Sequence, residues 1–581
     1  MAHSRLKTLG RYLRPHWKVS GLGTIALLVV NGLGVYIPLL IRNGVDDLQE
    51  TVDFQRVVWQ VLLIVALASI MWAIRMTSRI LIFGVGRKVE FDLKQKIFNH
   101  LIALEASYFS NSRIGDLINR ATSDVDNIRR LVGFAVLSLV NTVFAYALTL
   151  PVMLAIDVKL TLLSVSVYPL MLLLVQVFSG KLRDQQMEVQ EKLSNLSDLI
   201  QEDMSGISLI KIYAQEENER RAFVGNNGEL LEANLKLART RNFLFPLLGG
   251  LASLSLLILL AVGDQAIASG DLSVGDFVAL VLYIERLVFP TALLGFTITA
   301  YQRGEVSVDR VESILSIKPK IQDSPDPIPL RTPVQGWLSA RDLTFTYPEA
   351  KTPALSRVNF TIAPGETIAV VGPIGSGKTT LANAIPRLLD IDIDRLFLDG
   401  QDITQMPLGQ LRGAIGYVPQ ESFLFSTTIA NNICYGDPQA ERSRVEAAAK
   451  LARIHDEILN FPNGYETIVG ERGITLSGGQ RQRTALARAL LSDAKVLILD
   501  DSLSSVDNQT ATEILDNLTS GAKQKTVVFI SHQMSAAMTA DRIFVMDKGA
   551  IVQVGTHEEL VTRKGLYQLL WNQHQLEEML G

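Results

Sequence analysis

Cysteine is nearly absent from this sequence of 581 residues. Its single cysteine, Cys434, excludes an intrachain disulfide framework. A surplus of one charge is also lacking, because 55 Lys and Arg face 59 Asp and Glu for a net charge of −4, and this balance does not indicate a nucleic-acid-binding protein. No small-residue cleavage site follows the first apolar run, which predicts a retained membrane helix and not a signal peptide.

Apolar residues are plentiful and unevenly distributed. They make up 48% of the chain, and 581 residues are too many for one ordinary core. We predict a transmembrane domain at 1–318, a linker at 319–335 and a soluble α/β domain at 336–581. The linker region carries Pro319, Pro325, Pro327, Pro329 and Pro333. Their fixed φ angles favour extended backbone and exclude a continuous helix.

Six apolar runs in the first domain approach the length that spans a bilayer, which takes ~20 mostly apolar residues as helix. They are Val19–Ile41, Val57–Ile74, Leu131–Ile156, Leu160–Gly180, Asn242–Gly263 and Phe277–Ala300. One such run could be a buried helix of a large soluble core, whereas six in one half of the chain predict six transmembrane helices.

The positions of Lys and Arg predict how these helices are oriented. The N-terminal stretch contains Arg5, Lys7, Arg11, Arg14 and Lys18, and the next loop, Arg42–Arg56, is acidic. Basic loops stay in the cytoplasm, so we expect a multi-pass protein of the inner (plasma) membrane with its N-terminus in the cytoplasm. Six crossings then return the soluble domain to the cytoplasm.

Three polar features of the membrane half remain. The segments Arg87–Arg130 and Lys181–Arg241 are predicted to be helical arms that continue into the cytoplasm, the alternative being solvated loops. Glu285 and Arg286 interrupt the sixth run. Charges inside such helices usually face a partner or a water-filled cavity, so the pair either lines a substrate pathway or lies near the end of a helix that begins later.

A complete phosphate-binding loop occurs in the soluble half. It follows a strand-like run, Thr367–Val371, and precedes a helical one, Thr380–Leu389, as the motif requires. Glycines allow backbone N–H groups to surround phosphates, and the helix N-terminus adds positive potential. The predicted ATP-binding residues here are Gly372, Pro373, Ile374, Gly375, Ser376, Gly377, Lys378, Thr379 and Thr380. Lys378 should reach the β- and γ-phosphates, and the Thr379 hydroxyl should bind Mg²⁺.

The segment Leu476-Ser477-Gly478-Gly479-Gln480 decides among the classes of P-loop protein, because it resembles the signature of the ABC ATPase family. At a helix N-terminus, Ser477, Gly478, Gly479 and Gln480 can bind a γ-phosphate. The resemblance implies that this ATP is held by a second subunit, so one chain cannot complete either site.

Further motifs of that family follow in order. The resemblance implies that Tyr347 stacks on adenine, that Gln420 contacts Mg²⁺ and the arms, that Asp500 holds Mg²⁺ and that His532 contacts the γ-phosphate. Gly470-Glu471-Arg472-Gly473 resembles an exporter-type loop, and Ser504-Ser505-Val506-Asp507 resembles a D-loop. Thr379, Gln420 and Asp500 thus form the expected Mg²⁺ ligands.

The resemblance extends into the membrane half. Tyr108-Phe109, Arg113–Leu117 and Asp124–Asp126 look like the first cytoplasmic arm of type IV exporters, and Gln201–Ile207 with Lys211–Glu216 looks like the second. The implied fold is a six-helix membrane α-helical domain fused to a soluble α/β P-loop NTPase domain of ABC type. The most similar set is the bacterial half-size multidrug exporters.

One residue departs from the family pattern. Asp501 stands where the family has a glutamate that polarises the attacking water, and it is one methylene shorter. A catalytic base must come within ~2.6–3.2 Å of its proton, and a displacement of about 1 Å can cost ~10²-fold in rate. With Asp501, His532 and Gln420 as catalytic residues, this site should bind ATP and hydrolyse it slowly, as in one subunit of heterodimeric exporters. A homodimer with slow turnover stays open.

We therefore expect ATP-driven export of a hydrophobic or amphiphilic drug, lipid or peptide by alternating access, with a second half-transporter subunit and the lipid bilayer as partners. The alternative is an ATP-binding regulatory subunit of a heterodimeric exporter. An ATP-gated channel is disfavoured because the linker is too short for a regulatory insert. A soluble ABC protein is excluded by six spans, and no nucleic-acid partner is expected.

Overall fold

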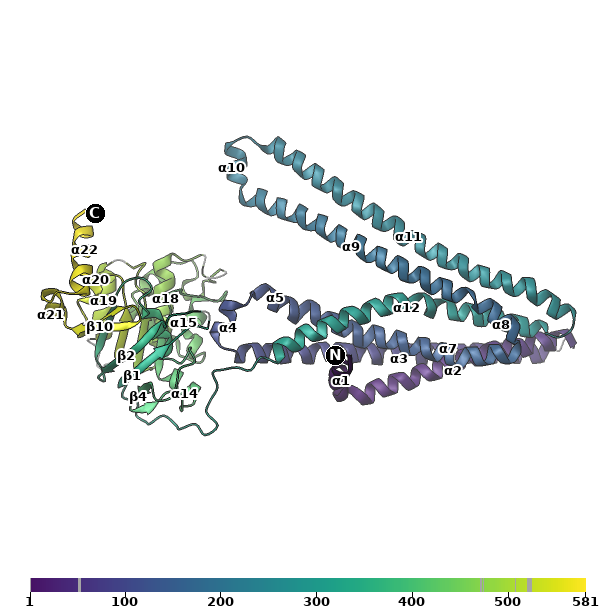
Figure 1. Ribbon diagram of the computed structural model, residues 1–581, viewed down its shortest axis with the longest axis horizontal. Helices are drawn as coiled ribbons and strands as arrows, with labels where there is room; N and C mark the ends of the chain where they lie inside the picture. The colour runs from purple at the N-terminus through teal and green to yellow at the C-terminus, as the bar shows by residue number, and fades with distance from the viewer. Residues whose placement is uncertain are drawn as a thin grey trace. The chain divides into compact units, whose positions relative to one another are not determined.

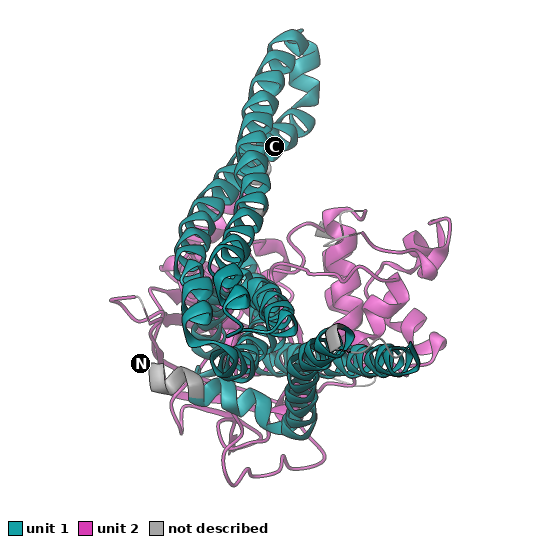
Figure 2. Ribbon diagram, turned by 90° about the vertical axis from the view of Figure 1, so that its right-hand side faces the viewer, with its two compact units in different colours: residues 1–102, 112–317 teal, residues 103–111, 318–581 magenta. Residues whose placement is uncertain are grey.

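The computed structural model describes residues 2–50, 54–348, 350–470, 473, 475–506, 508–519 and 525–580. The chain divides into two compact units (Figure 2). The helical unit comprises residues 1–102 and 112–317, and the sheet unit comprises residues 103–111 and 318–581. The segment 103–111, which the sequence analysis assigns to the first arm, therefore belongs to the sheet unit.

Six helical stretches among the described residues are long and apolar enough to span a membrane. They are Lys7–Leu48, Phe54–Ala103, Ile114–Ile156, Val158–Ser205, Glu216–Ala268 and Val274–Leu315. Each contains one of the six predicted runs, which confirms the prediction of six transmembrane helices. The helices of this unit are α1 (Ala2–Leu13), α2 (Trp17–Glu50), α3 (Phe54–Ala103), α5 (Ile114–Asn119), α6 (Val125–Arg130), α7 (Val136–Ile156), α8 (Val158–Val165), α9 (Val167–Ser205), α10 (Ile207–Ile212), α11 (Glu216–Ala268) and α12 (Val274–Leu315).

The two polar segments are helical, so the alternative of solvated loops is wrong. α3 continues to Ala103, and π-helical turns at Arg120–Asp124 and Leu131–Ala135 flank α6. In the second segment, α9 and α11 lie side by side with the short α10 at their far end (Figure 1). The amphipathic, charge-rich sequence of these segments favours long solvated helices over loops.

Short polar caps determine where the transmembrane helices begin. The Asp157 side chain accepts a hydrogen bond of 2.7 Å from the backbone N–H of Leu160 and starts α8. Ser273 and Asp276 form a capping box at the start of α12. Such caps satisfy backbone N–H groups that have no partner within the helix, so α8 and α12 can each begin after a short connection.

α12 packs against α2, α7 and α9. At the centre of this packing Tyr283 is fully buried, and its hydroxyl donates a 2.7 Å hydrogen bond to the carbonyl of Val35 on α2. Because α12 begins at Val274, Glu285 and Arg286 lie well within it. The interpretation that this pair lies near the end of a later-starting helix is wrong.

The sheet unit is built on a six-stranded sheet with the order β10-β9-β3-β8-β7-β6. Its strands are β3 (Thr367–Val371), β6 (Ile415–Val418), β7 (Val496–Asp500), β8 (Thr526–Ile530), β9 (Arg542–Asp547) and β10 (Ala550–Gly555). All neighbours are parallel except β9 and β10. β3, β7 and β8 are buried throughout, as unbroken apolar runs in a covered parallel sheet require.

A second, antiparallel sheet has the order β2-β1-β4-β5. Its strands are β1 (Leu338–Phe345), β2 (Leu355–Ile362), β4 (Leu396–Leu398) and β5 (Gln401–Asp402). The helices of the sheet unit are α4 (Ala106–Asn111), α13 (Lys378–Ala384), α14 (Leu408–Gly413), α15 (Ile429–Ile433), α16 (Arg442–Leu451), α17 (His455–Leu459), α18 (Gly478–Leu491), α19 (Asn508–Thr519), α20 (Met534–Ala537), α21 (His557–Thr562) and α22 (Leu566–Leu580).

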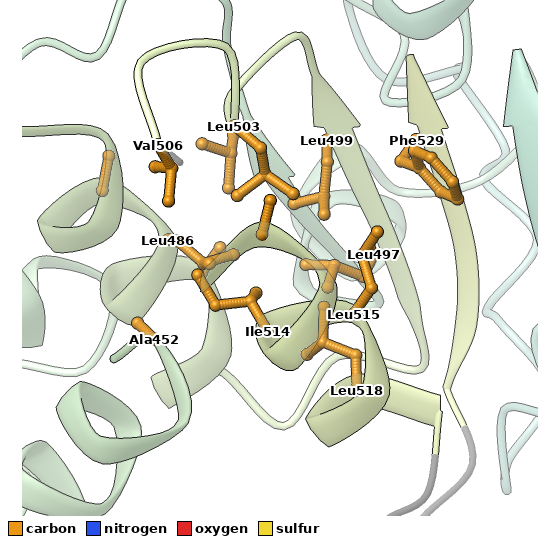
Figure 3. Close-up of a cluster of buried hydrophobic side chains, with 14 of the residues drawn as sticks. Ala452, Leu486, Leu497, Leu499, Leu503, Val506, Ile514, Leu515, Leu518 and Phe529 are labelled. Atoms are coloured by element: carbon orange, nitrogen blue, oxygen red, sulfur yellow. The ribbon is translucent and has the colours of Figure 1, made fainter. Parts of the chain in front are cut away.

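Buried aliphatic side chains attach α18 and α19 to the large sheet. Leu486 on α18 and Ile514 on α19 meet Leu497 and Leu499 on β7 and Phe529 on β8 (Figure 3). All five are at most 1% exposed. This packing fixes the carboxyl end of β7, where the two consecutive aspartates of the candidate site begin.

Two predicted segments differ in detail. The predicted helix Thr380–Leu389 is α13, which ends at Ala384, because Pro386 lacks the N–H that a helix needs and disfavours helical backbone at the residue before it. The proline-rich linker contains no helix between Leu315 and Leu338, as predicted, but it is not a free spacer. Its backbone binds the sheet unit, for example through a 2.8 Å hydrogen bond from Ile328 N to the carbonyl of Gln405.

Candidate nucleotide-binding site

The phosphate-binding loop starts directly after β3 and ends in α13. Gly372 has φ of +152° and Gly377 has φ of +97°, which side-chain-bearing residues rarely adopt. A Cβ at Gly372 would lie 2.2 Å from the carbonyl oxygen of Met546, and one at Gly377 would lie 2.4 Å from that of Ala354. Glycine is therefore required at both positions to form the cradle.

Lys378 closes this loop from inside. Its Nζ donates hydrogen bonds to the carbonyl oxygens of Gly372 (2.8 Å) and Pro373 (2.9 Å), and the residue is only 6% exposed. Burial lowers the pKa of Lys378, and the nearby negative charges of Asp501 and Asp500 oppose that shift. The loop thus holds a buried ammonium group at its centre, where an anion would be stabilised.

Two further groups of the loop fit an ATP–Mg²⁺ complex. The hydroxyl of Ser376 is buried and has no hydrogen-bond partner among the described residues, which leaves a polar group free for a ligand. Thr379 Oγ1 donates a 3.1 Å hydrogen bond to Oδ1 of Asp500. Burial raises the pKa of Asp500, and the bond from Thr379 opposes this rise. A hydroxyl and a carboxylate at this spacing are oxygen ligands of the kind that Mg²⁺ prefers.

The parallel sheet brings the other predicted residues to the same edge, because the carboxyl ends of parallel strands lie together. Gln420 is exposed two residues beyond β6, and His532 is exposed two residues beyond β8. His532 lines a cavity of about 210 Å³ together with Gly372, Pro373 and Ile374.

The backbone of Asp501 is held from both sides. Its φ is +49°, and its N–H donates a 3.1 Å hydrogen bond to the carbonyl of Ile530. Its carbonyl accepts a 2.9 Å bond from the hydroxyl of Ser504. These bonds hold the main chain in place beneath the half-buried carboxylate.

Tyr347, the predicted adenine-stacking residue, lies beside the start of α13. Its ring packs edge-on against Phe345 with 5.0 Å between centroids. Its hydroxyl lies 3.3 Å from Oγ1 of Thr380. The residue is 38% exposed, so part of it is accessible to a ligand.

The signature segment forms the N-terminus of α18. Ser477 accepts a hydrogen bond from the N–H of Gln480 (3.2 Å), whose side chain accepts one from the N–H of Ser477 (3.0 Å). This reciprocal capping box fixes the first turn. A Cβ at Gly479 would lie 2.8 Å from the carbonyl oxygen of Ser505, so the second glycine allows the D-loop to approach closely.

Two residues that the sequence analysis did not single out hold this segment in place. The side chain of Gln482 donates to Ser504 Oγ (3.1 Å) and accepts from Ser505 N (2.9 Å), and Glu457 accepts a bond of 2.9 Å from Gln480. The polar residues that follow the signature were the sequence feature that could have pointed to Gln482. Glu471, Arg472 and Asp507, which belong to predicted motifs, lie outside the described residues.

The structure does not bring the signature and the phosphate-binding loop together. Within the described part of the chain, no hydrogen bond joins Ser477–Gln482 to Gly372–Thr380. The helical unit holds a separate polar feature, since Glu285 and Arg286 both line a cavity of about 540 Å³ between the transmembrane helices.

Comparisons with known proteins agree with this geometry. Residues 20–291 match the family described as ABC transporter transmembrane region, and residues 355–504 match the family described as ABC transporter. The chain is 33% identical over 575 residues to a probable multidrug resistance ABC transporter ATP-binding/permease protein of Bacillus subtilis, covering 99% of this chain and 98% of the relative.

Two further comparisons cover almost the whole chain. An ATP-dependent lipid A-core flippase of Syntrophus aciditrophicus is 32% identical, with 98% of this chain and 94% of the relative covered. The solved structure of a bacterial Atm1-family ABC exporter with ATP bound superposes with a TM-score of 0.77 at 25% identity, covering 95% of this chain and 98% of that one.

Proposed function

Because this chain belongs to the ABC transporter family, and is thus a multi-pass membrane protein whose ATP hydrolysis is coupled to transport, we propose that it exports a hydrophobic or amphiphilic molecule. The relatives carry names for multidrug resistance and for lipid A-core flipping. Both imply amphiphilic cargo. The observation that carries the proposal is a single chain with six candidate spans and a complete phosphate-binding loop.

A chain with one membrane domain and one nucleotide-binding domain works as a dimer. The phosphate-binding loop and the signature of this chain share no hydrogen bond within the described residues, which supports the proposal that each is one half of an ATP site. We propose that the loop of one chain and the Ser477–Gln480 turn of the other enclose one ATP. Closure of two such sites would move α4 and α10 at the ends of the arms, and through them the transmembrane helices.

At each site, Tyr347 would stack on the adenine and the residues from Gly372 to Thr380 would hold the phosphates. Thr379, Gln420 and Asp500 would hold Mg²⁺, which neutralises charge on the phosphates when it is bound. Lys378 would exchange its two carbonyl bonds for the β- and γ-phosphates. The carboxylates of Asp501 and Asp500 oppose the lowering of the pKa of Lys378 by burial, which favours the charged form that this role requires.

Hydrolysis requires a group that orients and deprotonates water, and Asp501 and His532 are the candidates. A glutamate at position 501 would carry its carboxylate farther by one C–C bond, about 1.5 Å. The hydrogen bonds to Ile530 and Ser504 hold the backbone at Asp501, which supports the proposal that its shorter side chain stops short of the attacking water. We propose that this chain's own site hydrolyses ATP slowly and that its signature serves a competent site on a different partner chain.

This favours a heterodimer, in which the present chain could also act mainly as an ATP-binding regulatory subunit. Native mass spectrometry of the complex, purified through a tag on this chain from the membranes in which it occurs naturally, distinguishes the states. A homodimer would weigh twice 64.0 kDa. A complex that contains a second, different half-transporter supports the heterodimer. Detection of a homodimer alone would contradict the heterodimer proposal.

Transport is tested with the complex reconstituted in liposomes, to which a fluorescent amphiphile is added from outside. External ATP should drive movement of the amphiphile into vesicles whose nucleotide-binding domains face outward, and the Lys378→Ala variant should not. ATP-independent movement at the same rate in both would contradict the export proposal.

We also propose the inner membrane, with the N-terminus and the sheet unit in the cytoplasm. In a Cys434→Ser background, single cysteines at the exposed Ser443 of the sheet unit and the exposed Ser269 between α11 and α12 form a matched pair. A membrane-impermeant maleimide should label Ser269→Cys in intact cells and Ser443→Cys only in inverted vesicles. The reverse pattern would overturn the orientation.

A further inference from the structure

The cavity that contains Glu285 and Arg286 is rich in arginine. Its volume is about 540 Å³, and it is lined from α2, α3, α7 and α12. Three arginines and one acidic residue line it: Arg75, Arg79, Arg286 and Glu285. We call it the arginine cavity. Its remaining lining is mostly apolar and aromatic, with Phe83, Phe134 and Phe289 among the contacts.

No salt bridge neutralises these cations within the described residues, and Glu285, the acidic residue of the lining, can offset only one of the three charges. Among the described residues, Arg75, Arg79 and Arg286 form no salt bridge. Arg286 Nη2 donates only to the carbonyl and side-chain oxygens of Asn31, at 3.1 Å each, and its Nε has no partner. Charges within transmembrane helices are costly unless they meet a partner or water. An anion in this cavity would therefore be strongly stabilised.

The backbone of α2 is shaped around the Arg286 head group. A Cβ at Gly34 would lie 1.5 Å from Nη1 of Arg286, so any larger residue there would displace the guanidinium from this position. Asn31, which is 2% exposed, accepts from Arg286 and donates a 3.1 Å bond to Asn141 on α7. Arg286 is thus held in a fixed position by neutral groups, with donor capacity to spare.

A second cavity of about 540 Å³ continues the same pattern. It is lined by Arg130, Arg183 and Arg303, and its lining includes no acidic residue. Phe134 lines both cavities. In this second cavity Arg130 binds Asp126 at 2.8 Å and Arg183 lies 3.8 Å from Asp184, so more of its positive charge is neutralised than in the arginine cavity.

We propose that the transported molecule is an amphiphile with an anionic headgroup, which Arg75, Arg79 and Arg286 bind while the phenylalanines contact its apolar body. This inference rests on the proposed function as an exporter and narrows its substrate class. Arginine suits phosphate and carboxylate headgroups because its planar fork donates two parallel hydrogen bonds. A headgroup of this kind could come from a membrane phospholipid or from a free anionic amphiphile.

The test is equilibrium binding to the intact complex in phosphatidylcholine nanodiscs without ATP, so that slow hydrolysis has no influence. The probes share one tail: radiolabelled dodecyl phosphate and radiolabelled dodecyltrimethylammonium. We expect dodecyl phosphate to bind at least about tenfold more tightly. Equal binding of the two, or tighter binding of the cation, overturns the proposal. Should a neutral or cationic amphiphile still be exported with ATP, the proposed function stands while this inference fails.

Variants locate the binding. Arg286→Gln and Arg79→Gln should each weaken dodecyl phosphate binding about tenfold, the effect of losing one charge-assisted hydrogen bond. Glu285→Gln should act in the opposite direction and strengthen it several-fold. Arg87→Gln, a change of equal charge at an exposed residue of α3 that pairs with Glu90, is the matched control.

The cavity can still be tested if one variant fails to fold, and the source of the headgroup can be identified separately. If Arg286→Gln misfolds, Arg79→Gln and Glu285→Gln still test the cavity, because both residues are exposed. An unchanged affinity in both would contradict the proposal. Nanodiscs in which phosphatidylglycerol replaces part of the phosphatidylcholine separate the two sources. Competition with dodecyl phosphate identifies a lipid headgroup, and unaltered binding identifies a free amphiphile.

Discussion

The phosphate-binding loop of the sheet unit and the arginine cavity of the helical unit differ in how their positive charges are partnered. In the sheet unit, Lys378 is enclosed by two carbonyls and lies near two carboxylates, and Arg542 pairs with Glu366. In the helical unit, Arg286 has only amide oxygens as acceptors. The first arrangement completes a site whose ligand the local motif already specifies. In the second arrangement the arginines form no salt bridge within the described residues. Only the sign of their charge and the apolar lining around them indicate what the cavity binds.

The largest expected effect concerns Lys378 in the phosphate-binding loop of the sheet unit. Lys378→Ala should lower ATP hydrolysis about 10²–10³-fold, because a preorganised charge on the transferring phosphoryl group is lost. Steady-state ATPase activity of the purified chain alone measures this, because a partner chain would hydrolyse ATP at its own competent site. Lys450→Ala on the exposed side of α16 is the control. Should both variants hydrolyse ATP at the wild-type rate, the phosphate-binding assignment would be wrong.

The next prediction concerns backbone shape in the same loop. Gly377→Ala places a methyl group 2.4 Å from a carbonyl at φ of +97°, so we expect a loss of about 2–3 kcal/mol in the stability of the sheet unit. Gly375→Ala shares the positive φ but meets nothing within 4 Å, and should cost about 1 kcal/mol. Gly409→Ala, in open space on α14, should stay within about 0.5 kcal/mol. Urea unfolding of the full chain ranks the three, and any other order contradicts the account.

A smaller effect concerns the paired charges of the sheet unit. Burial raises the pKa of Glu366, but hydrogen bonds from Arg542 and from the N–H of Ala363 outweigh it, so the net pKa is lowered. A lowered folded-state pKa stabilises the protein above the unfolded value of about 4.3 and loses that contribution as pH falls through the folded value. Glu366→Gln should therefore cost about 1 kcal/mol at pH 7, after solvent screening of the partly exposed Arg542.

The pH dependence of that difference is the measurement. The gap in unfolding free energy between wild type and Glu366→Gln should shrink below pH 4.3, and Arg542→Gln should show the same profile. A gap that is constant from pH 7 to pH 3 would mean that the pair contributes through packing and not through charge.

The smallest effect compares one hydrogen bond in each unit. Tyr283 and Tyr567 are both fully buried, and each hydroxyl has a partner at 2.7 Å, the Val35 carbonyl and His557 Nδ1 respectively. Tyr283→Phe should cost about 0.6 kcal/mol, as for bonds between membrane helices, and Tyr567→Phe about 1 kcal/mol. Hydrogen exchange of α12 and α22 measures the two losses. A larger loss of stability in α12 than in α22 would contradict the expected order.

The two units also differ in how far their sequence predicted them. The strand Thr526–Ile530 is β8 with the predicted ends, and the six apolar runs each fall in one helical stretch. Periodicity and run length suffice for such elements. The end of α13 was misplaced because its apolar pattern continues past Pro386, whose ring ends the helix.

Long-range contacts were beyond the sequence. The spacing of Gly372–Thr379 predicted the loop, but not that Gln482 would join the signature helix to Ser504 and Ser505. Glu285 and Arg286 left two interpretations open, because one helix shows neither the cavity nor Arg75 and Arg79 across it. Charges that meet across two helices, α3 and α12, follow from packing, which no local pattern records.

The central claim is that the Asp501 carboxylate is too short to reach the attacking water in this chain's own ATP site. The direct measurement is ATP hydrolysis by the purified chain alone in nanodiscs, wild type against Asp501→Glu, with Asp501→Asn as the control. The glutamate has to adopt φ of +49°, a strain of about 1 kcal/mol, so both chains should remain folded. We predict that Asp501→Glu hydrolyses ATP about 10²-fold faster than wild type and that Asp501→Asn is slower. A wild-type rate equal to that of Asp501→Glu would contradict the claim.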